Sequence, residues 1–305
     1  MNKYKIKKWY KNEGYLLFFL IPALFFLCVF AIYPIVYNII ISFQNFNLFT
    51  INLPSKAFIG FKNYKDVLHS SDFLLVLFNT IVFTAASVFF QFIIGFIFAL
   101  ILTRKDIPSK LNNFCRSFIF LGWVLPDIVV ATTWKWLLST QGGAINYILM
   151  EFNFIRNPIS WLSDPNYALL GIIIANIWYG IPFNMMLLIG GLSGLPSDIY
   201  EAARIDGANK IKQFYHITLP LLKPTIFATL ILGTIFTLKV FGLIITMTGG
   251  GPVNASNILS VWSYQMSLKF FEFGQGAAIS NILLFIMLII SIFYIKVTSK
   301  EESYA

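Results

Sequence analysis

Residues 201–220 read EAARIDGANKIKQFYHITLP, a charged and polar stretch between two long apolar runs. The run before it covers residues 167–192, and the run after it covers residues 223–247. Each run is long enough to cross a hydrocarbon layer of about 30 Å as a helix. The charged stretch is therefore expected to form a loop that leaves a membrane between two spanning helices.

The composition of the whole chain supports a membrane location. Of its 305 residues, 58% are hydrophobic and 11% are charged, whereas about 25% of the residues in a soluble domain are charged. In water such a chain would expose too much apolar surface, so lipid is the expected solvent for most of it. The net charge of +9 would indicate nucleic acid binding in a soluble protein. Here we expect no nucleic acid partner and interpret the charge by its distribution across the bilayer.

Six predominantly apolar stretches have the length of a membrane span. All six are predicted to be helices, because an open strand in lipid leaves backbone groups without hydrogen bonds. The sequence therefore predicts an all-α integral membrane protein, with residues 1–305 forming a single domain. The predicted spans cover residues 15–42, 73–103, 115–138, 167–192, 223–247 and 277–296.

The distribution of Lys and Arg predicts the orientation of these spans. The two terminal tails and the connections after the second and fourth spans, with their flanks, hold fifteen Lys and Arg, whereas the alternate connections hold five. Basic residues concentrate on the cytoplasmic side of membrane proteins. Both termini and the loop of residues 193–222 are therefore expected to be cytoplasmic.

The chain lacks the residue patterns of an enzyme site. The glycines of GGGP at 249–252 have no following G-K-[ST] and are expected to form a turn. The two histidines, His69 and His216, are expected on opposite sides of the membrane, so they do not form a metal site together. Cys28 and Cys115 show no functional pattern and are not expected to pair. We therefore expect no catalytic residue, metal or cofactor in this chain.

Local features of the loop predict two short helices joined at Gly207. Asp198 and Glu201 have the spacing of an N-terminal cap, and a glycine suits the left-handed residue that ends a helix. Pro220 is expected to mark the entry into the fifth span. Two interpretations remain open, an amphipathic helix that rests on the bilayer and an element that docks on a cytoplasmic partner. The apolar face expected after the glycine consists of Ile211, Phe214, Tyr215 and Thr218.

The loop also resembles a family signature, the EAA loop of binding-protein-dependent ABC importer permeases. The longer form, EAARIDGA followed by ITLPLLKP, resembles the carbohydrate class, the relatives of the maltose and glycerol-phosphate systems. Gly242, which follows KVF, departs from this class, where an acidic residue is often found. The residues that carry the resemblance are Glu201, Ala202, Ala203, Gly207, Ile217, Leu219 and Pro220.

Other segments resemble recurring patterns of the same class, so that the resemblance covers nearly the whole chain. The last of them points to the first of the two permease subunits of such a system. These segments are FIGFKNYKDVL (58–68), FNTIVF (78–83), WKWLLSTQGGAINYIL (134–149) and TGGGP (248–252).

The resemblance implies the architecture of a type I ABC importer permease, with six transmembrane helices and a coupling helix in the cytoplasmic EAA loop. In that family, two different permeases form the pathway, two cytoplasmic ATPases use ATP to drive it, and an extracellular binding protein delivers the sugar. The resemblance therefore implies a multi-pass protein of a bacterial cell membrane. Its substrate would be a disaccharide, an oligosaccharide or a polyol phosphate, and its EAA residues would couple it to an ATPase.

Candidate pathway residues are polar, aromatic and charged side chains of the spans. Amides and aromatic rings suit sugars, although helix packing explains the same residues. A charge deep in lipid costs about 3 kcal/mol and needs a partner or a watery cavity, so we hypothesise that Asp127 and Lys239 pair when the pathway is closed. Alternatively, Lys239 extends to the interface and Asp127 caps a break at Pro126. The candidates are Asp127, Asn176, Trp178, Tyr179, Asn184 and Lys239.

Two other functions fit a polytopic chain without catalytic motifs. An ion-coupled secondary transporter would concentrate ionisable residues at mid-membrane, and this chain offers Asp127, Lys135 and Lys239. A structural membrane scaffold would not need an EAA loop. Uptake that requires ATP and a binding protein would distinguish an importer permease from both.

Overall fold

The computed structural model describes residues 19–104 and 106–302, with side chains of the last helix described to residue 296. These residues form helices joined by loops, with an isolated antiparallel bridge between Gln44 and Phe58. Five helices are long and apolar enough to cross a membrane, and a sixth span results if one bent helix pair counts as one. The predicted all-helical membrane fold is confirmed.

The described residues form two compact units, residues 19–68 with 265–281 and residues 69–104 and 106–264 with 282–302. In the first unit, Asn38 of α2 donates hydrogen bonds to Asn281 Oδ1 (2.7 Å) and Ser280 Oγ (3.1 Å) at the start of the last helix. Its elements are a helix that begins at Phe19 and includes the π-helical turn η1 (Cys28–Ile32) and α2 (Tyr33–Ser42), then α3 (Lys62–Leu68), η3 (Gln265–Lys269) and the first turns of α14 (Phe273–Glu302).

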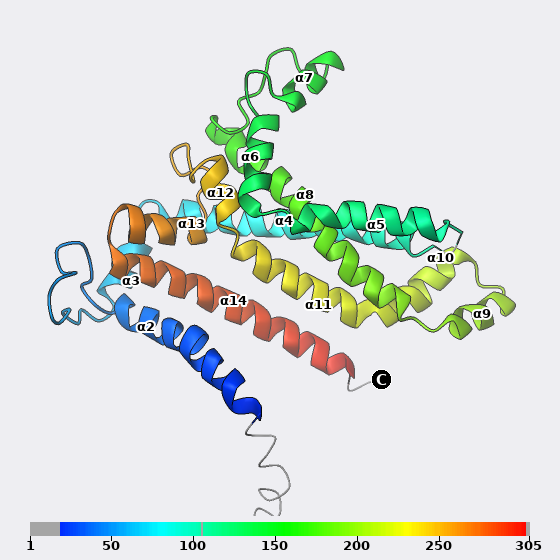
Figure 1. Ribbon diagram of the computed structural model, residues 1–305, viewed down its shortest axis with the longest axis horizontal. Coiled ribbons are helices and arrows are strands. Elements are labelled where there is room, and N and C mark those ends of the chain that lie inside the picture. The colour runs from blue at the N-terminus through cyan, green and yellow to red at the C-terminus, as the bar shows by residue number, and fades with distance from the viewer. Residues whose placement is uncertain (1–18, 105, 303–305) are drawn as a thin grey trace, which may run out of the picture. The chain divides into compact units, whose positions relative to one another are not determined.

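The second unit contains the long helices of the chain's middle and the last part of α14 (Figure 1). A buried apolar cluster joins α4, α8 and α11 and includes Ala99, Met185, Leu188 and Leu222. The helices of this unit are α4 (Phe73–Leu102), α5 (Ser109–Val124), α6 (Asp127–Leu137), α7 (Ala144–Glu151), α8 (Pro165–Ser193), α9 (Ser197–Ile205), α10 (Lys210–Gln213), η2 (Phe214–Thr218), α11 (Leu219–Leu238), α12 (Gly242–Met247) and α13 (Leu259–Tyr264).

Four of the predicted spans agree with observed helices within a few residues. The predicted spans at 73–103 and 167–192 correspond to α4 and α8, and the span at 277–296 lies within α14. The first observed helix ends at Ser42 as predicted, while residues 15–18 of that prediction lie outside the described residues. The single domain expected for residues 1–305 stays a prediction.

The third span was predicted as one helix over residues 115–138, and this prediction is wrong. The chain forms α5 and α6, which are bent by 96° at the break between them (Figure 1). Leu125 and Pro126 between them are extended, with ψ near 139° and 138°. Proline has no N–H to donate and disfavours helical geometry in the residue before it, so α5 ends before Pro126 and α6 begins after it.

The fifth span, predicted over residues 223–247, also differs from the structure. The observed helix begins at Lys210, runs through α10, η2 and α11, and ends at Leu238. Pro220 therefore lies near the start of α11, within this longer helix. After a break at residues 239–241 the chain continues as the short helix α12. This break contains no proline, and Gly242 follows it directly.

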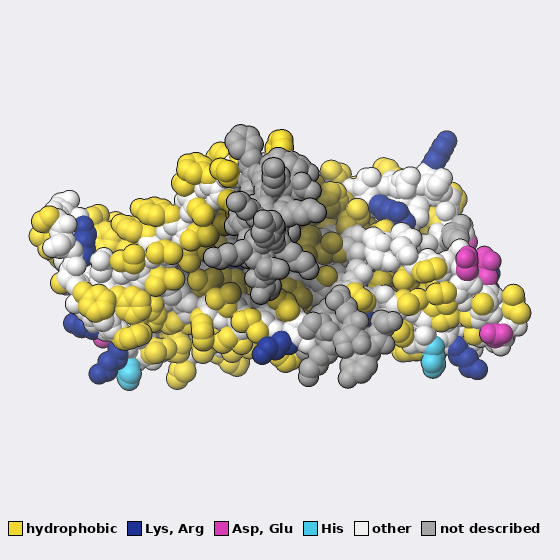
Figure 2. Space-filling model, turned by 90° about the horizontal axis from the view of Figure 1, so that it is seen from below, with side chains coloured by type: hydrophobic (Ala, Val, Ile, Leu, Met, Phe, Trp, Pro, Cys, Tyr) yellow, Lys and Arg dark blue, Asp and Glu magenta, His cyan; other side chains and the backbone are white. Residues whose placement is uncertain are grey.

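The surface of the protein is rich in apolar side chains. Figure 2 shows hydrophobic side chains over much of the visible face, while several Asp and Glu side chains gather at the end of the second unit that carries α9. Phe89, Phe118 and Phe285 are examples of large exposed hydrophobic residues on long helices. Such a surface is stable against lipid rather than water.

Asn79 near the start of α4 holds the loop that follows α12. Its side-chain nitrogen donates to the carbonyl oxygens of Asn254 (3.0 Å), Ala255 (3.2 Å) and Asn257 (3.2 Å). One buried amide thus satisfies several backbone acceptors of a loop, which fixes the chain between α12 and α13.

Asn79→Leu should therefore destabilise the protein by about 1–3 kcal/mol, because buried carbonyl groups lose their donor. The measurement is the thermal unfolding midpoint of the purified protein in nanodiscs. Asn113→Leu, at an exposed position on α5, is the matched control and should leave the midpoint unchanged. Equal midpoints for both variants would contradict the role of Asn79.

Candidate functional site

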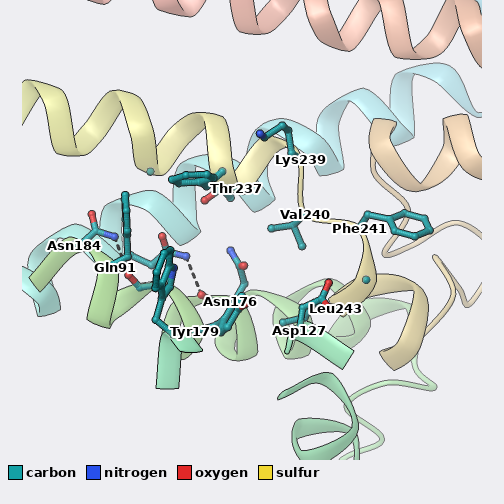
Figure 3. Close-up of a pocket in the computed structure, with 16 residues that line it drawn as sticks. Gln91, Asp127, Asn176, Tyr179, Asn184, Thr237, Lys239, Val240, Phe241 and Leu243 are labelled. Atoms are coloured by element: carbon teal, nitrogen blue, oxygen red, sulfur yellow. Dashed lines mark hydrogen bonds between the residues drawn. The ribbon is translucent and has the colours of Figure 1, made fainter. Parts of the chain in front are cut away.

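A cavity of about 420 Å³ lies in the second unit, where α4, α8 and the two broken spans meet (Figure 3). Both breaks contribute to its wall, since the helix ends on either side of them carry lining residues. The lining residues are Gln91, Trp123, Asp127, Asn176, Tyr179, Gly180, Phe183, Asn184, Gly233, Phe236, Thr237, Lys239, Val240, Phe241, Gly242 and Leu243.

Five of the six predicted pathway residues line this one cavity, although they come from three separate parts of the sequence. Trp178 does not line it. Its side chain lines a neighbouring apolar groove together with Phe118 and Pro182, and it makes an edge contact with Trp134 at 6.1 Å between ring centroids. The five residues brought together are Asp127, Asn176, Tyr179, Asn184 and Lys239.

Three buried amide side chains give the cavity its neutral polar groups. Gln91, Asn176 and Asn184 are 3%, 2% and 1% exposed. Gln91 donates to the backbone oxygen of Asn176 (2.8 Å), and Asn184 donates to the backbone oxygen of Gly180 (2.9 Å). Among the residues that the structure describes, Asn176 Nδ2 and Asn184 Oδ1 have no hydrogen-bond partner. Both atoms are buried, and they belong to residues of the cavity wall, so this wall holds an unpaired amide donor and an unpaired amide acceptor.

The two charged residues of the cavity do not form an ion pair in this structure. Lys239 lies instead with Nζ 5.5 Å from the ring centroid of Phe236, in a cation–π geometry. Asp127 is the first residue of α6, directly after the break at Pro126. The break at Pro126 that the alternative interpretation included is thus present, but no side-chain hydrogen bond caps the start of α6. The hypothesis that Asp127 and Lys239 pair in a closed pathway stays a prediction.

Aromatic rings form a connected part of the cavity wall. Phe183 stacks on Trp123 with ring centroids 5.6 Å apart and makes an edge contact with Phe236 at 5.1 Å. These rings come from α5, α8 and α11, so they also hold the three helices together. Tyr179 donates from its hydroxyl to the carbonyl oxygen of Leu125 (3.3 Å), which receives this bond at the break before α6.

The loop of residues 193–222 follows the C-terminal end of α8 and turns at Gly207. This glycine has φ +80°, the left-handed conformation that ends a helix. Ala208 N donates to Ala203 O (2.8 Å) and Gly207 N donates to Arg204 O (3.1 Å), the hydrogen bonds of a Schellman motif. The predicted turn at Gly207 is confirmed.

The helix caps of this loop differ from the prediction. Pro196 precedes α9 and makes no side-chain cap, while Asp198 lies in the first helical turn, so the predicted cap by Asp198 is wrong. Asn209 caps the next helix instead, since its side-chain oxygen accepts from Lys212 N (2.8 Å). After the glycine there is one long helix rather than a second short one.

One contact holds the loop together and another attaches it to α4. The hydroxyl groups of Tyr200 and Thr218 are 2.9 Å apart, and the rings of Phe214 and Phe96 are 6.0 Å apart. Of the predicted apolar face, Thr218 is buried and Phe214 is partly buried, whereas Ile211 and Tyr215 are exposed. Only half of the predicted apolar face therefore packs against the protein, and the other half is exposed.

No residue of α9 is buried, and Ile205 is 86% exposed. Of the EAA residues, Glu201, Ala202, Gly207 and Pro220 are exposed, while Ala203, Ile217 and Leu219 are partly buried. The α9 helix thus presents apolar and charged side chains together at the surface.

Polar side chains of α5 donate hydrogen bonds to the last backbone carbonyl of α4. Asn112 Nδ2 donates to Leu102 O (2.7 Å), and Arg116 also donates to this carbonyl. In the connection that follows, Arg104 Nε donates to Asp106 Oδ1 (2.9 Å). This hydrogen bond lowers the pKa of the Asp106 carboxyl. Both of these side chains are exposed, so the pair contributes little to stability.

The sequence reasoning missed several cavity residues. Gln91 was detectable as an isolated amide in a long apolar run, but Trp123, Phe183 and Phe236 are three among many aromatic residues of the chain. Among the described residues, no group of three or more His, Cys, Asp and Glu is arranged to hold a metal ion.

Broken helices that line a polar cavity within the membrane are a feature of many membrane transporters. Residues 91–298 match the family described as "Binding-protein-dependent transport system inner membrane component". The chain belongs to this family. It is therefore embedded in a membrane as a permease component of such a transport system.

Relatives match over nearly the full length of the chain. It is 36% identical to the trehalose/maltose transport system permease protein MalF of Thermococcus litoralis, covering 96% of each chain. It is 30% identical to the diacetylchitobiose uptake system permease protein DasB of Streptomyces coelicolor, covering 88% of this chain and 82% of that one. The fold is similar to that of a chain in a crystal structure of a bacterial alginate ABC transporter bound to a periplasmic protein, with a TM-score of 0.78, 22% identity and 94% of each chain covered.

Gly207→Val should loosen the loop, because a β-branched residue in the left-handed conformation costs about 1–2 kcal/mol. A cost of this size raises the population of the opened loop at least about fivefold. The measurement is the rate of trypsin cleavage at the exposed residues Arg204 and Lys210, followed by mass spectrometry.

The matched control is Gly190→Val, since Gly190 is helical and its Cβ would meet no atom within 4 Å. The control should cleave at the wild-type rate. Unchanged cleavage in both variants would show that Gly207 does not determine the loop conformation.

Proposed function

We propose that this chain is the membrane-spanning permease subunit of an ATP-driven importer whose substrate is a sugar. The observation that carries this proposal is the cavity, in which unpaired amide groups, one carboxylate and aromatic rings surround a space between broken spans. The transport systems named for the relatives MalF and DasB act on trehalose or maltose and on diacetylchitobiose, which supports a carbohydrate substrate for this chain.

The chemistry of the cavity suits a neutral, hydroxyl-rich ligand. Sugar hydroxyls both donate and accept hydrogen bonds, so they complement amide side chains such as those of the lining residues Asn176 and Asn184. Rings such as Phe183 and Phe236 provide apolar faces for the C–H groups of a sugar. We therefore assign substrate contact to Asp127, Asn176, Tyr179, Asn184 and Lys239, and leave out Trp178, which faces the neighbouring groove.

The exposed helix α9 is the proposed coupling element. No residue of α9 is buried and Ile205 is exposed, so the helix offers an apolar and charged surface that contact with a partner protein would cover. The partners we propose are two ATPase subunits, which use ATP. The EAA residues Glu201, Ala202, Ala203, Gly207, Ile217, Leu219 and Pro220 would form the contact or support it.

A second permease subunit and an extracellular sugar-binding protein complete the proposed transporter. Family membership supports a binding protein, and the similar alginate transporter is bound to a periplasmic protein. The distribution of basic residues supports cytoplasmic termini and a cytoplasmic α9. The carbohydrate class and the TGGGP segment support a role as the first of two different permeases.

The experiment is uptake by proteoliposomes that contain the complete transporter. Uptake of a labelled maltodextrin or trehalose should require ATP inside, the binding protein outside and both permeases. An ion gradient without ATP should drive no uptake. If the gradient alone drives uptake, the chain acts as a secondary transporter and the proposal fails.

Asn176→Leu should reduce sugar uptake about tenfold or more, because a donor next to the substrate is lost and 1.4 kcal/mol corresponds to a factor of ten. Asn113→Leu, at an exposed position on α5, is the matched control and should keep wild-type uptake. The measurement is the initial uptake rate at several sugar concentrations. Equal rates in the two variants would remove Asn176 from the substrate site.

A cysteine at Asp206 tests the orientation. In a background with Cys28 and Cys115 replaced by serine, Asp206→Cys should resist an impermeant thiol reagent in intact cells. Gln141→Cys, which lies in a connection expected outside, should react. Both positions are exposed. Reaction at residue 206 and protection at residue 141 would invert the proposed orientation.

A further inference from the structure

Gly242, the first residue of α12, faces the carboxylate of Asp127. A Cβ atom added at Gly242 would lie 2.0 Å from Asp127 Oδ2 and 2.7 Å from its Cγ. Non-bonded carbon and oxygen atoms do not approach so closely, so the carboxylate occupies the space in which a side chain at residue 242 would begin. The two residues are more than a hundred positions apart in the sequence. In the fold, the Asp127 carboxylate lies directly beside the backbone of Gly242.

A second contact shows that α6 holds α12 along its length. Lys135 Nζ donates to the carbonyl oxygen of Thr246 (3.1 Å), in the last turn of α12. Asp127 lies beside the first residue of α12, so α6 places a negative charge near the N-terminus of α12 and a positive charge near its C-terminus. Between these charges, Val130 and Ala131 belong to one buried cluster with Leu243 and Ile244.

The Asp127 carboxylate is also available to a ligand. Asp127 is the one acidic residue that lines the cavity, and its side chain is partly exposed. Within the described residues, no protein group donates a hydrogen bond to it and no ion pair includes it. Figure 3 shows Asp127 beside Leu243, on the side of the cavity away from Asn184.

We propose that Gly242 is a positioning residue that places the Asp127 carboxylate on the cavity wall, and that this carboxylate determines specificity for hydroxyl-bearing substrates. The inference rests on the proposed function, since the ligand of the cavity is taken to be a sugar. The required feature is a single carboxylate in this volume. Whether the α6 side or the α12 side supplies it should matter less.

Exchanging the two residues should therefore preserve one carboxylate in this volume. Asp127→Ala leaves no carboxylate in the volume, and Gly242→Asp places two there, in steric and electrostatic conflict. Each single variant should lose at least tenfold in sugar uptake. The double variant Asp127→Ala/Gly242→Asp again holds one carboxylate and should recover severalfold relative to the worse single variant. The assay is ATP-dependent uptake of a labelled maltodextrin or trehalose by the reconstituted transporter.

Two further variants separate charge from space. Asp127→Asn keeps the shape and removes the charge, and it should lower uptake and raise the apparent KM. Gly242→Ala keeps the carboxylate but displaces it, and it should do the same, whereas Gly190→Ala adds a methyl where nothing lies within 4 Å and should have no effect. Normal uptake in both Asp127→Asn and Gly242→Ala would overturn the role in specificity.

A disulfide test does not depend on transport. Because the added Cβ is 2.7 Å from Asp127 Cγ, the two Cβ atoms are within about 4 Å, the usual separation in a disulfide. Asp127→Cys/Gly242→Cys, with Cys28 and Cys115 replaced by serine, should oxidise readily, as measured by free thiols in mass spectrometry. Thr133→Cys/Gly242→Cys moves one cysteine about 9 Å along α6 and should not.

The outcomes distinguish this inference from the proposed function. If the wild-type transporter takes up no sugar but the cysteines at 127 and 242 pair, the proposed function fails while the contact stands, and the role in sugar specificity falls with the function. If wild-type uptake is normal, a failure of the double variant to exceed the worse single variant would overturn the inference. Failure of the cysteines to pair would overturn it as well.

Discussion

The bilayer offers no water to the backbone, and this constraint determines where the chain can depart from a helix. Each N–H and C=O in the hydrocarbon region needs a partner from the protein or a polar cavity. The two breaks in the spans meet this requirement through side chains. Tyr179 donates to Leu125 O at the first break, and Ser260 donates to Val240 O (2.7 Å) at the second. Because irregular backbone is tolerated where it lines a cavity, the breaks and the cavity depend on each other.

The sequence predicted the continuous helices well because their length and composition are local properties. The runs at 73–103 and 167–192 became α4 and α8 almost residue for residue. Pro126 was visible, yet an apolar window over residues 115–138 does not report a bend of 96°. The break at residues 239–241 has no proline. The next residue, Gly242, lies against the carboxylate of Asp127 on another helix. Such a break is a tertiary feature that one sequence does not display.

The site was predicted in part for the same reason. Polarity within an apolar span is visible in the sequence, and it identified Asn176 and Asn184 as candidates. The direction of a side chain is less visible, since adjacent residues of a helix point about 100° apart. Tyr179 therefore lines the cavity while Trp178 faces the neighbouring groove. The departure at Gly242 was noticed in the sequence, but its meaning required the position of the Asp127 carboxylate.

A cryo-EM structure of the assembled transporter with sugar trapped inside would show directly whether the cavity binds the substrate. We expect density for the sugar between α4, α8 and α11, in contact with Asn176 and Asp127, with breaks still present at Pro126 and at residues 239–241. Sugar bound outside this cavity, or a continuous helix from α11 into α12 in the sugar-bound state, would contradict this expectation.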